Sequence, residues 1–396
     1  MFELSLLYIN MLLPVFTPWT NNTTGSTLHN LILIFLCSIN LLLSKKYILT
    51  KKNFIFYLNI FYIFMIFTGI YISLEYLIIR DFFEFQRPVF YILAFFTGQL
   101  YFYKKKSRDI IKDLKIFFLM IIIISLIKVI DPDNSFYYLY QRKVLADQVR
   151  LSGTFISPYD FGFFLLFPLY FYLELYFKNK KIIYIFLSVI VFSLIVFTES
   201  KSQIITLLFS VVIYIIVKFI LNKKESIKII KYLIFLAIII YFGINIFREE
   251  VMRRIPYLYF GLKRIIEGGV QNDPSGNIRF NQYLKAFETF KLLGYGPAKG
   301  RGLDFENQYS LYLYRYGILG IVYNSILILG IFKLNFRMMK KYRNIEMKAV
   351  VVAFIIFTFS LPIAMLANNM TDQLKISFFI YFILGLIINL ERRTKK

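Results

Sequence analysis

Residues 203–221 read QIITLLFSVVIYIIVKFIL, and Lys218 carries the only charge in this stretch. A helix needs about 20 apolar residues to cross the hydrocarbon of a bilayer, so the stretch has the length and composition of a membrane span. Backbone groups inside a bilayer must find hydrogen-bond partners within the protein, which predicts a helix. The rest of the chain repeats the pattern, because short lysine-rich connectors separate runs of Ile, Leu and Phe.

The composition extends this prediction to the whole chain. Hydrophobic residues make up 58% of the 396 residues, compared with roughly 45–50% in soluble domains. We predict an all-α, polytopic integral membrane protein with about 12 transmembrane helices, divided into N-terminal membrane helices over 1–149 and a second membrane region over 150–396. The apolar segments lie at approximately 2–19, 28–44, 53–73, 88–103, 115–130, 160–177, 182–198, 203–221, 229–247, 307–332, 349–366 and 373–390.

Charge divides the connectors into two sets. Every second connector is rich in lysine, and positive connectors stay on the cytoplasmic side, so both termini are predicted to be cytoplasmic. The net charge of +24 is therefore mostly a topology signal. Because it is spread over short juxtamembrane clusters, a nucleic-acid partner is not expected. The basic connectors are at 45–52, 104–108, 178–181, 223–224, 340–343 and 392–396.

The reactive side chains are few. Cys37 is the only cysteine and His29 the only histidine, so neither an intrachain disulfide nor a zinc site of the usual His/Cys type is possible. We expect no metal and no cofactor. Residues 131–133 have the spacing of a metal-binding DxD motif, although Asp-Pro is also a common turn opener. For His29, a capping or interfacial role is the alternative to titration.

One long segment, 248–306, interrupts the hydropathy pattern and falls on the predicted outer face. Long loops in compact folds are usually functional or disordered. Apolar spacing predicts two amphipathic helices in this segment, one at about 248–267 that lies in the membrane interface and one at about 277–293. Turn residues separate them, and Gly294-Tyr295-Gly296-Pro297 follows. Glycines there allow a ligand to approach the backbone closely.

Arginine is the main basic residue of the predicted outer connectors, whereas lysine dominates the inner ones. The planar guanidinium binds phosphate through two hydrogen bonds. The alternative is that single arginines pair with nearby carboxylates or reach lipid head groups. The outer arginines are Arg80, Arg87, Arg142, Arg150, Arg248, Arg253, Arg254, Arg264, Arg279 and Arg301.

Four short motifs follow one another between residues 150 and 330, separated by predicted spans. They are Arg150-Leu151-Ser152-Gly153-Thr154-Phe155 with Pro158 and Gly162; Thr198-Glu199-Ser200-Lys201-Ser202; Arg279 and Ala286 with Leu293-Gly294-Tyr295-Gly296-Pro297; and Asn307 with Gly317 and Gly320. In type and order they resemble the motifs of the bacterial O-antigen polymerase and ligase superfamily.

This resemblance implies a fold of about twelve helices in the bacterial inner membrane with a periplasmic, arginine-lined catalytic cavity. It also implies glycosyl transfer from a polyprenyl-diphosphate-linked oligosaccharide, without metal or nucleotide. Membrane lipid is a further partner, and a chain-length regulator and a flippase are candidates. Glu306 stands where the ligases carry histidine, which favours a polymerase. A ligase that transfers finished glycan to lipid A core is the alternative. A lipid-linked oligosaccharide flippase is less favoured, because no internal repeat is evident.

Site residues follow from this chemistry. Arg150 and Arg279 are expected to stabilise the diphosphate leaving group, and Glu306 to accept the proton of the attacking sugar hydroxyl. Alternatively, Glu306 only favours the positive end of the helix that follows it. Tyr295 is expected to stack on a sugar ring. The candidate substrate-binding residues are Asn307, Lys201, Arg254, Tyr295, Gly294 and Gly296.

Overall fold

The computed structural model describes residues 2–14, 22–44, 54–130, 150–227, 229–230, 249, 255–297, 305–341 and 347–393, and within these ranges the chain is helical, without a β-strand. Four short 3₁₀ helices are η1 (Leu74–Tyr76), η2 (Phe83–Phe85), η3 (Val270–Asn272) and η5 (Met370–Asp372). The α-helices are α1 (Phe2–Leu12), α2 (Asn22–Leu43), α3 (Phe54–Ile72), α4 (Ile79–Phe82), α5 (Gln86–Lys104), α6 (Ser107–Ile130), α8 (Pro158–Asn179), α9 (Ile182–Phe197), α10 (Lys201–Leu221), α13 (Pro256–Gly268), α14 (Pro274–Glu288), α15 (Gln308–Lys341), α16 (Lys348–Met365) and α17 (Leu374–Arg393).

Six of the described helices are long and apolar enough to cross a membrane: α3, α8, α10, α15, α16 and α17. The prediction of an all-helical chain with membrane-spanning helices is confirmed to this extent. The count of twelve spans stays a prediction, and the span expected at 229–247 lies almost entirely outside the described residues.

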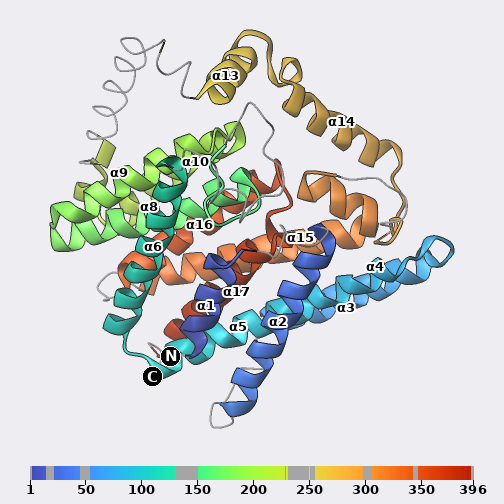
Figure 1. Ribbon diagram of the computed structural model, residues 1–396, viewed down its shortest axis with the longest axis horizontal. Helices are drawn as coiled ribbons and strands as arrows, with labels where there is room; N and C mark the ends of the chain where they lie inside the picture. Colours follow the sequence, from blue (N-terminus) through green and yellow to red (C-terminus); the bar gives the residue numbers. More distant parts are fainter. Residues whose placement is uncertain are drawn as a thin grey trace.

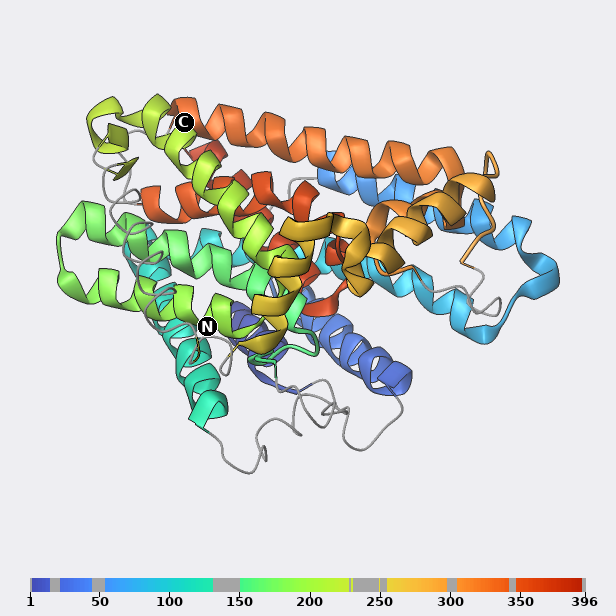
Figure 2. The same cartoon turned by 90° about the horizontal axis from the view of Figure 1, so that it is seen from above.

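The long helices lie side by side (Figures 1 and 2). Helix α17 packs along α5, α15 packs along α3, and α16 lies between α8 and α10. Most residues of α8, α16 and α17 are buried, whereas most residues of α3, α10 and α15 are partly or fully exposed. The first three therefore form the centre of the bundle, and the other three have the apolar outer faces expected next to lipid.

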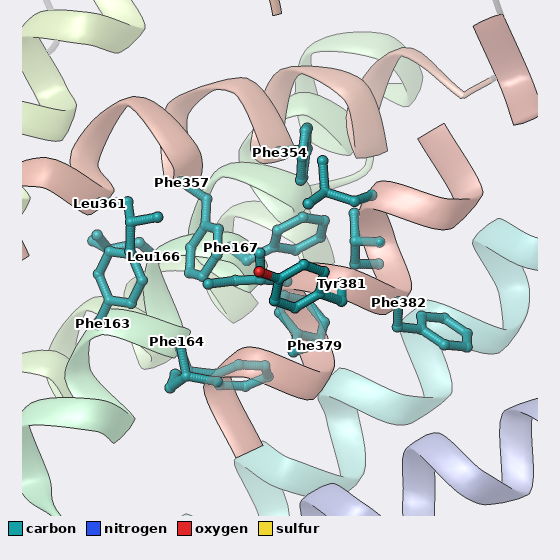
Figure 3. Packing of buried hydrophobic residues seen from close by; sticks show 14 of the residues in the cluster. Phe163, Phe164, Leu166, Phe167, Phe354, Phe357, Leu361, Phe379, Tyr381 and Phe382 are labelled. Carbon is teal, nitrogen blue, oxygen red and sulfur yellow. The ribbon is translucent and has the colours of Figure 1, made fainter. Parts of the chain in front are cut away.

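Phenylalanine rings fill the centre (Figure 3). Phe163 and Phe167 lie one helical turn apart on α8, so both point to the same side. The Phe163 ring lies 4.4 Å from that of Phe357 on α16, and the Phe167 ring lies 5.0 Å from that of Phe379 on α17. Tilted and edge-to-face contacts of this kind are the favoured arrangements of aromatic pairs. They join α8 to α16 and to α17.

Glycines bring α5 and α17 unusually close together. A methyl group added at Gly98 would overlap the Phe382 carbonyl, and one added at Gly385 would overlap the Phe95 carbonyl. Small residues of this kind let helix backbones approach in membranes, where packing rather than water drives association. The middle of α17 is thereby held close against α5.

Connectors assigned to one side by charge also meet in space. At one end Lys201 pairs with Asp273 and Arg87 with Asp372, which joins several predicted outer connectors. At the other end, Lys104, the last residue of α5, contacts both Glu3 and Ser44 of the predicted inner side. The grouping of helix ends follows the charge pattern. Which end faces the cytoplasm stays a prediction.

The boundaries of the second amphipathic helix were predicted wrongly. It was expected at about 277–293, but α14 begins at Pro274 and ends at Glu288. The Asp273 carboxylate accepts a hydrogen bond of 3.0 Å from the Gly276 N–H and caps the helix, and proline fits the first helical position. Of the first predicted helix, Pro256–Gly268 is observed as α13, and most of 248–254 lies outside the described residues.

Candidate functional site

Two buried lysines hold the loop at 151–157 that follows Arg150. The Lys128 ammonium donates to the Gly153 carbonyl at 2.7 Å. The Lys375 ammonium donates to the carbonyls of Thr154 (2.5 Å) and Leu13 (2.8 Å). Buried ammonium groups require such acceptors, because desolvation of an unpaired charge is costly. The loop is therefore tied to α6 and α17 before it enters α8.

Arg150 is positioned by the turn between α9 and α10. Its Nε donates to the Thr198 carbonyl at 3.1 Å, and its Nη2 to the Glu199 carbonyl at 3.3 Å. Glu199 adopts a left-handed conformation with φ 49°, which is uncommon for a residue other than glycine. The turn thus presents two adjacent carbonyl oxygens to one guanidinium.

Tyrosine rings join the cations of the site into a row. The Arg150 and Arg279 guanidinium carbons lie 4.8 Å and 5.3 Å from the centre of the Tyr159 ring. Arg150 and Lys201 likewise lie 4.6 Å and 4.5 Å from the centre of the Tyr257 ring. The electron-rich ring faces attract cations at such distances. We call the set Lys201, Tyr257, Arg150, Tyr159, Arg279 and Glu306 the arginine cluster.

Arg279 projects from α14 and reaches Glu306 at the start of α15. Its Nη1 donates to the Ser275 hydroxyl at 2.7 Å, and its Nη2 lies 3.3 Å from the Glu306 carboxylate. The Arg279 Nε is buried and has no hydrogen-bond partner among the described residues. A buried donor without a partner is costly, so this edge of the guanidinium is suited to an anionic ligand.

Glu306 is half-exposed, with 54% of its side chain accessible. Its backbone N–H donates to the Gln282 side-chain oxygen at 2.9 Å. The neighbouring Asn307 is buried, and its side-chain oxygen accepts from the Ser310 N–H at 2.8 Å, which caps α15. Asn307, predicted to bind substrate, is therefore occupied as a helix cap, whereas the Glu306 carboxylate remains accessible beside Arg279.

The positive charge of Lys201 is largely compensated by Asp273. Its ammonium lies 2.5 Å from the Asp273 carboxylate, and its side chain packs over Gly261, where a methyl group would overlap it. Because Asp273 also caps α14, Lys201 links the start of α10 to both α13 and α14. The remaining positive charge of the cluster belongs to the two arginines.

Tyr295, Gly294 and Gly296 lie in a loop whose backbone is hydrogen-bonded to the backbone of α15. Helix α15 is interrupted at Gly317, which has φ 56° and ψ −133°. The Tyr295 and Gly296 N–H groups donate to the carbonyls of Tyr314 (2.9 Å) and Arg315 (2.7 Å) just before this break. Gly294 and Gly296 have φ values of 73°, which side-chain-bearing residues rarely adopt.

The Tyr295 ring is engaged within the protein. It stacks on Tyr314 with ring centres 4.6 Å apart, and the Lys291 ammonium lies 4.4 Å from its centre. The predicted stacking of Tyr295 on a sugar stays a prediction, but in this arrangement one face of the ring is covered by Tyr314. The loop is held against α15 at Tyr314 and Arg315.

Glu199 connects the turn to α13. Its carboxylate accepts hydrogen bonds from the N–H groups of Tyr257 (2.9 Å) and Leu258 (3.3 Å) at the start of that helix. Burial raises the pKa of Glu199 above its ordinary value, although these hydrogen bonds and the Arg150 charge act in the opposite direction. The same residue therefore places Arg150 through its carbonyl and Tyr257 through its carboxylate.

The structure brings together Arg150, Arg279, Glu306 and Lys201 of the predicted site. Arg254 lies outside the described residues. The sequence interpretation missed Tyr159 and Tyr257, although each directly follows a proline that begins a helix. It also missed Asp160, which is buried and accepts from the Asn368 amide at 2.8 Å. The repeated Pro-Tyr pair was the local signal for the two tyrosines.

The cluster offers cationic and carboxylate groups and no evident metal ligand set. Within the described ranges, no group of three His, Cys, Asp or Glu residues could hold a metal ion. Two guanidinium groups beside one accessible carboxylate can bind a multiply charged anion and accept a proton next to it. That combination suits transfer of a group away from a phosphate.

Comparison with known proteins adds no relative. No protein-family model, curated protein or solved structure matches the chain. The resemblance to the O-antigen polymerase and ligase superfamily therefore rests on the four motifs. The geometry of the arginine cluster is the independent basis for a function.

Proposed function

We propose that this protein polymerises lipid-linked oligosaccharide repeat units on the outer face of the bacterial inner membrane. The donor is a polyprenyl-diphosphate-linked glycan, and the acceptor is a sugar hydroxyl of a second lipid-linked unit. One observation carries the proposal: Arg150 and Arg279, from motifs far apart in the sequence, flank the same Tyr159 ring, with the Glu306 carboxylate 3.3 Å from Arg279.

The reaction needs no redox partner. The acceptor hydroxyl oxygen forms a bond to the anomeric carbon of the donor sugar, and the bond between that carbon and the diphosphate oxygen breaks. The electron pair of the broken bond stays on the diphosphate, where the two guanidinium groups stabilise the added negative charge. The hydroxyl proton passes to the Glu306 carboxylate. The products are a lengthened glycan and a free lipid diphosphate.

Glu306 is favoured as the base because its carboxylate is accessible and its backbone is held in place. Its side chain is half-exposed, so a sugar hydroxyl can reach it. Its backbone is held by Gln282, and the next residue caps α15. The Asn307 side chain caps α15, so the cap of that helix does not require the Glu306 carboxylate.

A reconstitution assay tests the proposal. Purified protein in nanodiscs is supplied with lipid-linked oligosaccharide as the only substrate, and products are separated by size. We expect a ladder of glycans that differ by one repeat unit. Product that appears only after a separate lipid A core acceptor is added would refute the polymerase and support the ligase. Transbilayer movement of labelled substrate without any new bond would support a flippase.

Replacement of the proposed base gives a sharper test. Glu306→Gln keeps the size of the side chain but removes its ability to accept the proton, so turnover should fall by roughly 10²–10⁴. The matched control is Glu267→Gln, which changes an exposed carboxylate on α13. Normal ladder formation by Glu306→Gln would exclude this residue as the base.

A further inference from the structure

Helix α14 uses one face for the arginine cluster. Arg279 and Gln282 contact the Glu306 region, the Tyr283 hydroxyl donates to the Leu366 carbonyl at 3.3 Å, and Ala286 is buried. These positions are spaced three to four residues apart, so they lie on a single side of the helix. This side is committed to the bundle.

The adjacent face of α14 is apolar and exposed. Phe280, Leu284 and Phe287 are 41%, 45% and 66% exposed and follow the i, i+4, i+7 spacing of one helical stripe. Phe280 directly follows Arg279, so the stripe lies about 100° around the helix from the arginine face. Contiguous exposed apolar side chains usually mark a binding surface.

The stripe continues to the apolar surface of a membrane-span candidate. Leu292 and Leu293, after the end of α14, are also exposed. The Leu292 carbonyl accepts from the Ile318 N–H of α15 at 2.9 Å. Ile318 and Ile321 are exposed on α15, one of the helices long and apolar enough to cross a membrane. An apolar route therefore leads from Arg279 along α14 to the outer surface of α15.

We propose that this route, Phe280–Leu284–Phe287–Leu292–Leu293, binds the polyprenyl tail of the donor whose diphosphate is held by Arg150 and Arg279. The proposal rests on the proposed function, because it concerns the same ligand. A lipid diphosphate joins an anionic head directly to a long apolar chain, and α14 carries a cationic and an apolar face that begin at neighbouring residues. The apolar area buried by the chain adds to the affinity.

The lipid bilayer could also cover the apolar stripe of α14. The position of this stripe next to the arginine cluster favours the tail of the donor as its ligand. On α13 the exposed apolar residues Phe260 and Ile266 stand beside exposed Lys263 and Arg264, a mixture typical of helices in contact with lipid head groups. The α14 stripe instead begins beside Arg279, whose Nε is buried without a hydrogen-bond partner among the described residues. Contact with bulk lipid does not require an apolar stripe to begin beside a cationic site.

Binding of sugar-free diphosphates tests the inference. Full-length protein in nanodiscs is titrated with undecaprenyl diphosphate, which has a long tail, and with geranyl diphosphate, which has a short one. We expect Leu284→Gln combined with Phe287→Gln to raise the Kd for the long probe about tenfold, since loss of about 55 Å² of apolar contact suffices for that factor. The Kd for the short probe should not change. The control Ile266→Gln, on α13, should leave both values unchanged.

A photocrosslink on the wild-type protein covers the case in which the double variant fails to fold. Undecaprenyl diphosphate with a diazirine in its tail should label peptides within residues 280–293. Labelling confined to other helices would overturn the inference, as would equal losses for both probes, no loss, or the same loss in Ile266→Gln. Wild-type protein that binds neither probe would refute the proposed donor together with the inference. Tail binding without ladder formation would leave the inference standing and refute only the polymerase.

Discussion

Two regions of the molecule combine arginines, carboxylates and tyrosines, and they differ in the groups that contact the arginine side chains. Near the starts of α5 and α17, Arg87 lies 2.6 Å from the Glu84 carboxylate and 2.9 Å from the Asp372 carboxylate. Arg315 lies 3.6 Å from Glu84 and the Tyr312 hydroxyl donates to Asp372 at 2.8 Å. We call these five residues the Arg87 network. It contains two cations and two buried carboxylates, so its charges balance.

The arginine cluster is held differently. Arg150 donates to backbone carbonyls and lies against two tyrosine rings. Arg279 has a hydroxyl, a ring and the half-exposed Glu306 as partners. Neutral groups fix a guanidinium without cancelling its charge, whereas carboxylates both fix and cancel it. The chemical type of the groups around a guanidinium, rather than the presence of arginine, therefore distinguishes a structural ion network from a site able to bind an anion.

Removal of Arg87 should have the largest effect, and it should fall on stability. Arg87→Met leaves Glu84 and Asp372 buried with less compensation, and loss of one partner of a buried ion pair costs about 3–5 kcal/mol. The measurement is the unfolding free energy in detergent. Lys263→Met is the matched control, because both side chains of the Lys263–Glu267 pair are exposed and such a pair is worth about 0–1 kcal/mol. A variant as stable as wild type would show that the network is not structural.

Removal of Arg279 should instead act on activity. Loss of one charged donor to a leaving group lowers turnover by about 10²–10³, so Arg279→Ala should yield almost no ladder while the unfolding midpoint changes little. Arg264→Ala is the control, since Arg264 is exposed on α13. Loss of stability without loss of turnover would place Arg279 with the structural arginines and would remove the contrast between the two regions.

The sequence predicted the approximate positions of several helices, because hydropathy and capping are local properties. The predicted segment 203–221 became α10, Lys201–Leu221, and the two extra residues come from the cap that Ser200 provides. The turn observed at 198–200 lies within the turn predicted at 198–202, whereas the chain leaves α14 after Glu288, before the loop predicted to begin at Gly294. The early start of α14 could have been predicted from Asp273-Pro274, which was interpreted only as turn chemistry.

The site was predictable only in part. The motifs indicated Arg150 and Arg279, but the shared ring of Tyr159 depends on how α8, α13 and α14 pack, and no local pattern contains that information. The same limit applied to Asn307 and Lys201, since no local pattern indicated that their side chains contact Ser310 and Asp273. Long-range partners decide whether a polar side chain is available.

Two substitutions of Tyr159 distinguish the role of its ring from that of its hydroxyl within the arginine cluster. Each cation–aromatic contact is worth about 0.5–2 kcal/mol, so Tyr159→Leu should raise the KM for the donor about tenfold as both arginines lose their common support. Tyr159→Phe keeps the ring and should restore a nearly normal KM, since the only hydroxyl contact to Arg150 is long, at 3.4 Å. Equal impairment of the two variants in steady-state assays would assign the effect to the hydroxyl.

The smallest expected effect is the pH dependence contributed by Glu199, which supports the arginine cluster from the side. Burial raises its pKa above the ordinary value of 4.5, so between that value and the raised one the folded protein holds a proton that the unfolded chain has released. Stability contributed by Glu199 is then present below this window and falls as pH rises through it. Glu199→Gln removes the titration, and the midpoint difference between wild type and variant should change by about 1–2 °C across the window.

Thermal unfolding of both proteins in the same detergent, from pH 4.5 upward, measures this difference, and Glu267→Gln controls for an exposed carboxylate. The sign is the informative part. Should wild type gain stability relative to Glu199→Gln as pH rises, the two hydrogen bonds from the start of α13 outweigh burial. Glu199 would then be a carboxylate that its hydrogen-bond donors stabilise in the charged form.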